Sequence, residues 1–283
     1  MLQPWYVKII FGALVLIVII VSFIFISRIQ LERQVLAERD LLYKDLENGE
    51  EVIIEEDLSG LPEPVANWLD NIGVIGQNIY ASVSFDQTGA MKLEEDQKEW
   101  YTPEARQYVN IKKPGYLWTV DIPSFFTKGR DLYHKGSGSM LIKLAGAIPV
   151  VNESDNYKIN ESSLHRFLLE LPWYPTAALE DYMSWEEVDT NTVRGIITYQ
   201  DMTADAIFNF GDDGELISME AMRYKDVDEE APRLKCIGEI IDYTEVEGMK
   251  IPHKINVSWT EDGEKFTWYK IENYNFVFND YIN

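Results

Sequence analysis

Apolar and polar residues alternate most regularly in the stretch Ile251-Pro-His-Lys-Ile-Asn-Val-Ser-Trp259. Successive side chains of a β-strand point to opposite faces, so this stretch predicts a strand with one buried and one solvated face. Half-buried strands are typical of antiparallel sheets, because parallel strands are usually covered on both faces. The same period of two recurs on either side of the Asp212-Asp213-Gly214 turn, in Ala204–Phe210 and in Ile217–Ala221.

Between residue 79 and the C-terminus the sequence holds roughly ten such runs, separated by turn sequences such as Glu247-Gly248 and Asp262-Gly263. A sheet of this size must curl, close or pack against another element. We therefore predict the α+β class, with an N-terminal transmembrane helix followed by a strongly curved, half-barrel-like antiparallel β-sheet and a few covering helices.

Two of the covering helices have sequence signatures. Leu61-Pro-Glu-Pro predicts a helix start, because proline is tolerated in the first turn, and apolar residues at helical spacing follow it. A second helix is predicted to begin at Asn160 as N-cap. Its apolar residues from Leu164 to Leu171 are spaced for one helix face, and Pro172 ends the pattern. Thr176 is a candidate cap for one further turn.

The N-terminus carries the signature of a membrane span. Ile9–Ile26 contains 18 residues without a charge, which at ~1.5 Å per residue reach about 27 Å, close to the hydrocarbon thickness of a bilayer. A cleaved signal peptide and a buried core helix are the alternatives. No small-residue cleavage site follows the span, and the β-rich remainder offers no partner for a core helix. We predict an uncleaved anchor.

The chain is expected to have three parts. Residues 1–27 form the transmembrane anchor, residues 28–58 a helical stalk and acidic linker, and residues 59–283 the curved antiparallel β domain. Apolar residues at helical spacing between Arg28 and Asn48 favour a stalk that continues the anchor, with a dimerising coiled coil as the alternative. Gly49 is the expected end of that helix.

Charge and composition exclude several classes of protein. The chain has 25 Lys and Arg against 48 Asp and Glu, a net charge of −23. Residues 1–50 hold 5 basic and 6 acidic residues, so −22 of this charge lies on residues 51–283. An acidic surface argues against a nucleic-acid partner. The 46% hydrophobic and 13% aromatic content argues against disorder.

No residue pattern points to an enzyme, a metal or a cofactor. The single Cys236 excludes an internal disulfide framework and a cysteine-based zinc site. His134, His165 and His253 lack metal-ligand spacing. The serines near Gly136 lack the flanking glycines of a nucleophile elbow. Carboxylates are abundant, but a solvated acidic surface explains them, and no dinucleotide or phosphate-binding loop occurs. We expect a non-enzymatic protein without cofactor or metal.

Aromatic and proline residues cluster around the second helix and suggest a ligand pocket. Rigid aromatics beside irregular backbone can line an apolar cavity, although an ordinary core with a helix packed on a sheet would use the same residues. The candidate ligand-binding residues are Trp118, Met140, Phe167, Trp173, Tyr174 and Trp185.

The order of these motifs resembles an uncharacterised prokaryotic family known as a domain of unknown function. The shared motifs are Leu61-Pro-Glu-Pro-Val65, Pro114–Trp118, Gly136–Val150, Trp173-Tyr-Pro175, Phe208–Gly214, Arg223-Tyr224 and Asp242–Pro252. The resemblance covers about residues 60 to 275 and implies no activity. Its strand-rich layout is similar to the half-barrel of bacterial lipoprotein carriers of the LolA/LolB type, in which a bent sheet encloses an apolar cavity for acyl chains.

Together these features favour a membrane-anchored domain that binds a lipid or another hydrophobic ligand in an apolar cavity of a curved sheet. The alternative is an envelope scaffold or protein-interaction domain with a filled core. The carrier-like layout favours an extracytoplasmic position of the domain. Basic residues after the span weakly favour the opposite side.

Overall fold

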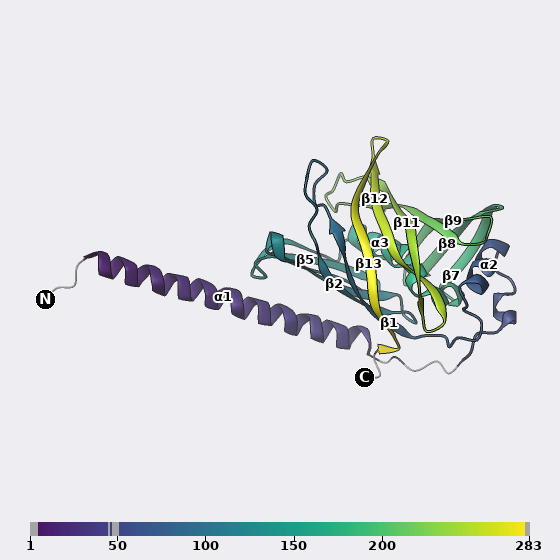
Figure 1. Cartoon of the computed structure of the whole chain (residues 1–283), viewed down its shortest axis with the longest axis horizontal. Coiled ribbons are helices and arrows are strands. Elements are labelled where there is room, and N and C mark those ends of the chain that lie inside the picture. The colour runs from purple at the N-terminus through teal and green to yellow at the C-terminus, as the bar shows by residue number, and fades with distance from the viewer. Residues whose placement is uncertain (1–4, 45, 47–50, 281–283) are drawn as a thin grey trace.

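A single antiparallel sheet of 13 strands forms the body of the protein in a computed structural model that describes residues 5–44, 46 and 51–280 (Figure 1). The strands are β1 (Ser82–Met91), β2 (Glu104–Asn110), β3 (Gly115–Ile122), β4 (Thr127–His134), β5 (Ser137–Leu144), β6 (Ile148–Ser154), β7 (Met183–Asp189), β8 (Thr192–Tyr199), β9 (Met202–Phe210), β10 (Leu216–Tyr224), β11 (Arg233–Val246), β12 (Met249–Glu261) and β13 (Glu264–Phe278). The helices are α1 (Trp5–Leu42), α2 (Glu63–Asn71) and α3 (Tyr157–Leu169), with the 3₁₀ turns η1 (Glu55–Leu58), η2 (Pro123–Phe125), η3 (Leu171–Trp173) and η4 (Pro175–Leu179). The predicted class and the large antiparallel sheet are confirmed.

The sheet consists of two meanders that meet in its middle. Its spatial order is β6-β5-β4-β3-β2-β1-β13-β12-β11-β10-β9-β8-β7, so every neighbouring pair except β1 and β13 is also consecutive in sequence. At this seam Gly89 lies opposite Ile271, and a Cβ on Gly89 would come within 1.9 Å of the Lys270 carbonyl oxygen. Glycine therefore permits the close approach of the two strands. The sheet remains open, with β6 and β7 at its edges.

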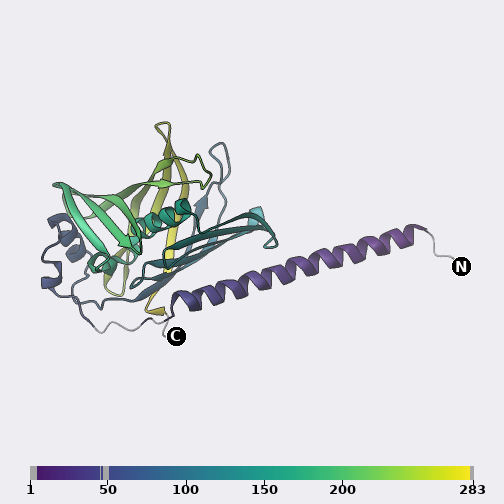
Figure 2. The same ribbon diagram turned by 180° about the vertical axis from the view of Figure 1, so that it is seen from behind.

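Helix α3 lies inside the bend of the sheet, between the two meanders (Figures 1 and 2). It contacts β8, β9 and β10 on one side and β4 and β5 on the other. The helix begins one turn earlier than predicted. Asn156 is the N-cap, because its side chain accepts a hydrogen bond from the Ile159 amide at 3.0 Å. Asn160 instead accepts a hydrogen bond from the Gly138 amide at 2.7 Å and ties α3 to β5.

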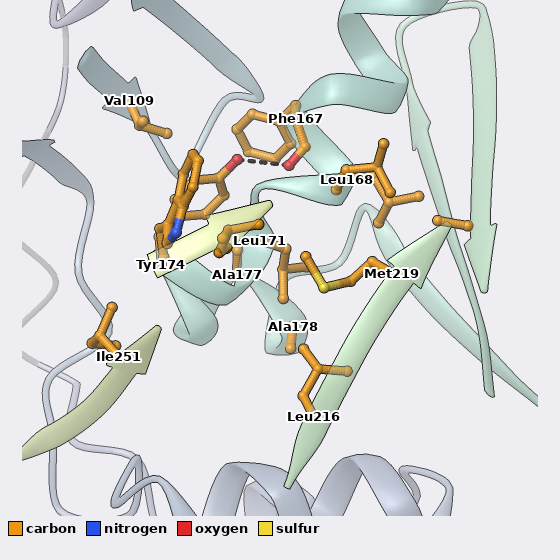
Figure 3. Packing of buried hydrophobic residues seen from close by; sticks show 14 of the residues in the cluster. Val109, Phe167, Leu168, Leu171, Tyr174, Ala177, Ala178, Leu216, Met219 and Ile251 are labelled. Carbon is orange, nitrogen blue, oxygen red and sulfur yellow. Dashed lines mark hydrogen bonds between the residues drawn. The ribbon is translucent and has the colours of Figure 1, made fainter. Parts of the chain in front are cut away.

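The chain after α3 continues into the core as two 3₁₀ turns, η3 and η4. Thr176 is buried within η4 and makes no side-chain cap, so the prediction of a Thr176-capped turn is wrong. Leu171, Tyr174, Ala177 and Ala178 pack with strand residues such as Met219 (Figure 3). Together, α3, η3 and η4 fill much of the concave side with apolar side chains.

Helix α1 is continuous from Trp5 to Leu42 and docks on the outside of the first meander. Its apolar part is long enough to cross a membrane, with a mean hydropathy of 3.4, and is not buried against the domain. Its second half does contact the sheet: Leu31 and Leu42 are buried, and Glu38 forms an ion pair with Arg130 of β4 at 2.5 Å. Gly49, the predicted end of this helix, lies outside the described residues.

Candidate functional site on the concave face

A row of polar and aromatic side chains crosses the concave face of the first meander. Gln107 of β2 lies opposite Trp118 of β3, and Trp118 lies opposite Asp131 of β4, so all three side chains share one face. That face is the one covered by α3, because Arg166 of α3 contacts all three residues. Met140 of β5 continues the row opposite Asp131.

Arg166 is the centre of this row. Its guanidinium donates to the Asp131 Oδ2 at 2.6 Å and to the Glu170 Oε1 at 2.7 Å. The guanidinium also lies 4.7 Å from the ring centroid of Tyr116 and 5.0 Å from that of Trp118, within cation–π range. Burial alone would lower the pKa of Arg166. Glu170, Tyr116 and Asp131 raise this pKa by more than burial lowers it, so the side chain stays charged. One cation and two carboxylates leave this centre with an excess negative charge.

Amides extend the network toward the middle of the sheet. The Gln107 Nε2 donates to Glu170 at 2.5 Å, and the Gln107 Oε1 accepts from Arg166 at 3.3 Å. The indole N–H of Trp118 donates to the Gln87 Oε1 of β1 at 2.6 Å. Gln87 lies opposite Asn273 of β13 across the seam. The bonded network thus runs from β4 to β1, with Asn273 of β13 beside its end. We refer to Gln87, Gln107, Trp118, Asp131, Arg166, Glu170 and Asn273 as the interior polar cluster.

Several buried polar atoms in and beside this cluster have no hydrogen-bond partner among the described residues. The unpartnered atoms are the Gln87 Nε2, both side-chain polar atoms of Asn273, the Asp131 Oδ1, the Tyr269 hydroxyl and the Trp173 Nε1. Gln87 and Asn273 are the most deeply placed, since each exposes only 1% of its surface. A buried polar group without a partner costs about 1–3 kcal/mol. The set includes donors and acceptors, which suits water or a neutral polar group of a ligand.

Three of the predicted ligand-binding residues lie together in the core. Phe167, Trp173 and Tyr174 are almost fully buried. The Tyr174 hydroxyl donates to the Phe167 carbonyl at 2.6 Å (Figure 3). The Trp173 ring meets that of Phe85 edge-on, at a centroid distance of 5.3 Å. The aromatic segment after α3 therefore borders the β1 end of the interior polar cluster.

The other three predicted residues occupy different surroundings. Trp118 belongs to the interior polar cluster. Trp185 lies in the second meander, where its indole N–H donates to the Ala178 carbonyl at 3.1 Å and its ring packs 5.1 Å from Phe208. Met140 is half-buried and also borders a groove between α1 and strands β4–β6. Whether these six residues bind a ligand stays a prediction.

Arg166 and its carboxylate and amide partners were not among the predicted site residues, although the sequence holds a signal for the amides. In β1 the inward positions read Val83, Phe85 and Gln87, and in β13 they read Tyr269, Ile271 and Asn273. Each series contains an amide where the alternation requires an apolar residue. Polar residues on the buried face of a regular strand mark a site or a structural network.

Three surface cavities lie elsewhere on the described part of the molecule. The groove bordered by Met140 has a volume of about 460 Å³ and includes Gln34 and Arg130. Two others, of about 420 and 220 Å³, adjoin each other near Ile72 and Tyr243. In residues 5–44, 46 and 51–280, no group of three His, Cys, Asp or Glu side chains is arranged to hold a metal ion.

Comparisons with known proteins place the chain in a family. A search of curated proteins finds no match. A LolA superfamily protein from Nitrosomonas europaea has a similar structure, with a TM-score of 0.43 and 7% identity over 79% of this chain and 93% of that chain. The sequence model of a family of unknown function, DUF6920, matches residues 59–278. This match spans well over half of the sequence, so the chain belongs to the DUF6920 family, as its motif order predicted.

Proposed function

We propose that this protein is a membrane-anchored, non-enzymatic domain that binds an amphipathic lipid or a similar hydrophobic ligand on the concave face of its sheet. One observation supports this most directly: unpartnered, almost fully buried polar groups lie beside an aromatic core. The Gln87 Nε2 and the Asn273 side chain are the innermost of these groups. An ordinary core avoids such groups because each is costly.

The chemistry of the cluster defines the class of ligand. The polar part of the ligand would pair with the Gln87 and Asn273 amides, and its apolar part would contact the rings of Phe85 and Trp173. Burial of that part contributes roughly 25 cal/mol per Å² before the costs of binding. The two carboxylates around Arg166 repel an anionic group, so we expect a neutral, zwitterionic or cationic polar group in this site.

The anchor places this site next to a source of lipids. The apolar part of α1 is the proposed membrane span, and α1 is docked on the sheet through Glu38 and Leu42. We propose that the domain lies on the extracytoplasmic side. Protease treatment of intact cells checks this orientation: loss of the domain supports it, and full protection places the domain in the cytoplasm.

Photo-crosslinking tests the ligand proposal on the full-length chain. The protein is reconstituted in vesicles of phosphatidylethanolamine doped with the same lipid carrying a diazirine in one acyl chain, and adducts are mapped by peptide mass spectrometry. We expect adducts on α1 and, in addition, on η3 and on the β1–β13 seam. Adducts confined to α1 would contradict ligand binding while supporting the anchor.

A matched pair of variants sharpens this experiment. Gln87→Leu removes an unpartnered amide from the site, and we expect it to lower the yield of seam adducts because the polar partner is lost. Gln34→Leu on α1 replaces an amide outside the concave face, where Gln34 donates to Glu38 at 2.8 Å, and it should leave the yield unchanged. Equal yields in both variants would contradict the assignment of the polar subsite.

A protein-interaction or scaffold role is the second candidate. Two observations favour it: α3, η3 and η4 fill much of the concave side, and the open sheet leaves β6 and β7 as edges. An edge strand offers unpaired backbone groups to a partner strand. This role predicts a protein crosslinked to β6 or β7 in native membranes, with no lipid adducts on the seam.

A further inference from the structure

Three segments that are distant in sequence meet at Arg28, just beyond the apolar span. The Arg28 Nε donates to the Ala145 carbonyl in the β5–β6 turn at 3.0 Å. The Ala145 amide in turn donates to the Phe126 carbonyl in the β3–β4 turn at 2.6 Å. The two turns are therefore joined to each other and to α1, and we call residues 122–127 and 144–150 the hairpin tips.

The contact with Arg28 fixes the height of the hairpin tips relative to the span. Arg28 follows Ile26, the last residue of the uncharged run, by two positions, which is ~3 Å along a helix axis. A cation at this position marks the boundary between hydrocarbon and headgroups. Figures 1 and 2 both show the ends of the β5 hairpin and its neighbours projecting beside α1 toward its N-terminus. The tips thus lie at the level where the span leaves the bilayer.

The hairpin tips expose apolar side chains to an unusual degree. Five large apolar residues in these two short segments are exposed: Phe125, Phe126, Leu144, Ile148 and Val150. Phe126 exposes 69% of its surface and has a φ of 52°, a left-handed conformation that is rare for a bulky residue. An exposed aromatic held in a strained conformation at a turn favours an interaction site.

The charges behind the tips complement phospholipid headgroups. Arg28, Lys128 and Lys143 lie at or beside the two turns, and Arg28 and Lys128 flank Gly146 within 3.4 Å of the position of a Cβ. Asp121, paired with Lys128 at 2.6 Å, is the one carboxylate of residues 121–128 and 143–150. Counted with Arg28, these two segments carry three cations and one carboxylate, although residues 51–283 carry −22. Cations behind an apolar edge suit a bilayer, with the side chains in acyl chains and the cations near phosphates.

We propose that the hairpin tips insert into the headgroup region of the same leaflet from which α1 emerges. The inference rests on the anchor in the proposed function and names the membrane surface that the domain meets. It gives the domain two attachments, a helix and an apolar edge. The concave strands β3–β6 would then end at the bilayer, where an amphipathic ligand could move from the leaflet onto the concave face.

Depth-dependent quenching tests this proposal on the full-length chain. A fluorescent thiol label is placed at Phe126→Cys or Ile148→Cys, at Phe23→Cys in the span, and at Val188→Cys on the distant edge strand β7. Ile148 and Val188 are similarly exposed, at 55% and 56%. Cys236 is buried, and the wild-type chain labelled in parallel supplies the background. Each variant is reconstituted in phosphatidylcholine–phosphatidylglycerol vesicles with or without acyl chains brominated near the headgroup.

We expect brominated lipid to reduce the fluorescence at residues 126, 148 and 23 and to leave residue 188 unchanged. Quenching at residue 23 without quenching at 126 and 148 would overturn this inference and leave the anchor intact. Absence of quenching at residue 23 would overturn the anchor and the inference together. Equal quenching at residues 148 and 188 would mean that the domain lies flat on the bilayer. Energy transfer between labels on two copies, without quenching by lipid, would mean that the tips contact a second chain. Both results would overturn the inference.

Discussion

Arg166 shows how a single side chain can organise the concave face. It is held between the carboxylates of Asp131 and Glu170 and between two aromatic rings, and it reaches from α3 across to β2, β3 and β4. A buried ion pair contributes little net stability when complete, because desolvation offsets the attraction. Breaking it is costly, because the remaining charges stay buried without a partner.

We therefore predict that Arg166→Met destabilises the protein by about 3–5 kcal/mol, since Asp131 and Glu170 lose their shared cation. Arg194→Met is the matched control, because Arg194 pairs with Glu186 and Asp205 on the exposed face of the second meander. Exposed ion pairs contribute little. Denaturant unfolding measures both variants, and equal losses would refute a special role for the Arg166 centre.

His165, the neighbour of Arg166 on α3, makes stability depend on pH. Burial lowers its pKa below the ordinary value of 6.5, and Arg223 also lowers it, although a hydrogen bond with the Glu161 carbonyl opposes this. As pH falls below 6.5, the unfolded histidine binds a proton while the folded one stays neutral, so acid favours unfolding. We expect the denaturant concentration at the midpoint of unfolding to decrease as the pH is lowered from 7.5 toward the pKa of the folded histidine. His165→Gln should make this decrease with pH smaller. An unchanged slope in the variant would contradict the assignment.

At the scale of elements, the position of α3 depends on a close approach to β5. A Cβ on Gly138 would lie 2.6 Å from the Ser163 Oγ and 2.8 Å from the Ile159 carbonyl oxygen. These contacts include helix backbone, which cannot move aside without displacing α3. The same short distance allows the Gly138 amide to donate to Asn160.

Gly138→Ala should therefore destabilise the protein by about 1–3 kcal/mol through overpacking. Gly238→Ala on β11 is the control, because the nearest contacts of its Cβ would be the flexible end of Met219 at 3.2 Å and the Ile255 side chain at 3.7 Å, with backbone no closer than 4.0 Å. Thermal unfolding compares the two. A smaller loss for the Gly138 variant than for the Gly238 variant would show that α3 is not held against β5 by this contact.

The elements also show what the sequence can and cannot predict. Regular alternation predicted the strands around Ile251–Trp259, because a half-buried strand imposes a period of two. The start of α3 was predicted one turn late, because Asn156 and Asn160 are both good caps and tertiary contacts decide between them. The Asn160 side chain accepts a hydrogen bond from the β5 backbone, and no local sequence pattern reveals this contact. Long-range backbone contacts thus limit prediction at element boundaries.

At the scale of the whole molecule, the sequence predicted the aromatic part of the candidate site and missed the polar part. Phe167, Trp173 and Tyr174 lie within eight residues of sequence and come together in the core. Gln87 and Asn273 are separated by almost the whole domain and meet only because β1 pairs with β13. The net charge of −23 likewise gave no sign of the cations at the hairpin tips, because a net charge does not show where individual charges lie.

The pairing of β1 with β13 has a consequence for biosynthesis. β13 begins at Glu264, 173 residues after β1 ends at Met91, so at roughly 5–20 residues per second the β1 edge waits about 10–35 s for its neighbour. An unpaired edge is prone to aggregation. The first meander also contacts α1, through Leu42 to Asn110 and Glu38 to Arg130, and all four residues are made before β13. Helix α1 can thus steady the first meander until the last strand is made, because it is bonded to β2 and β4.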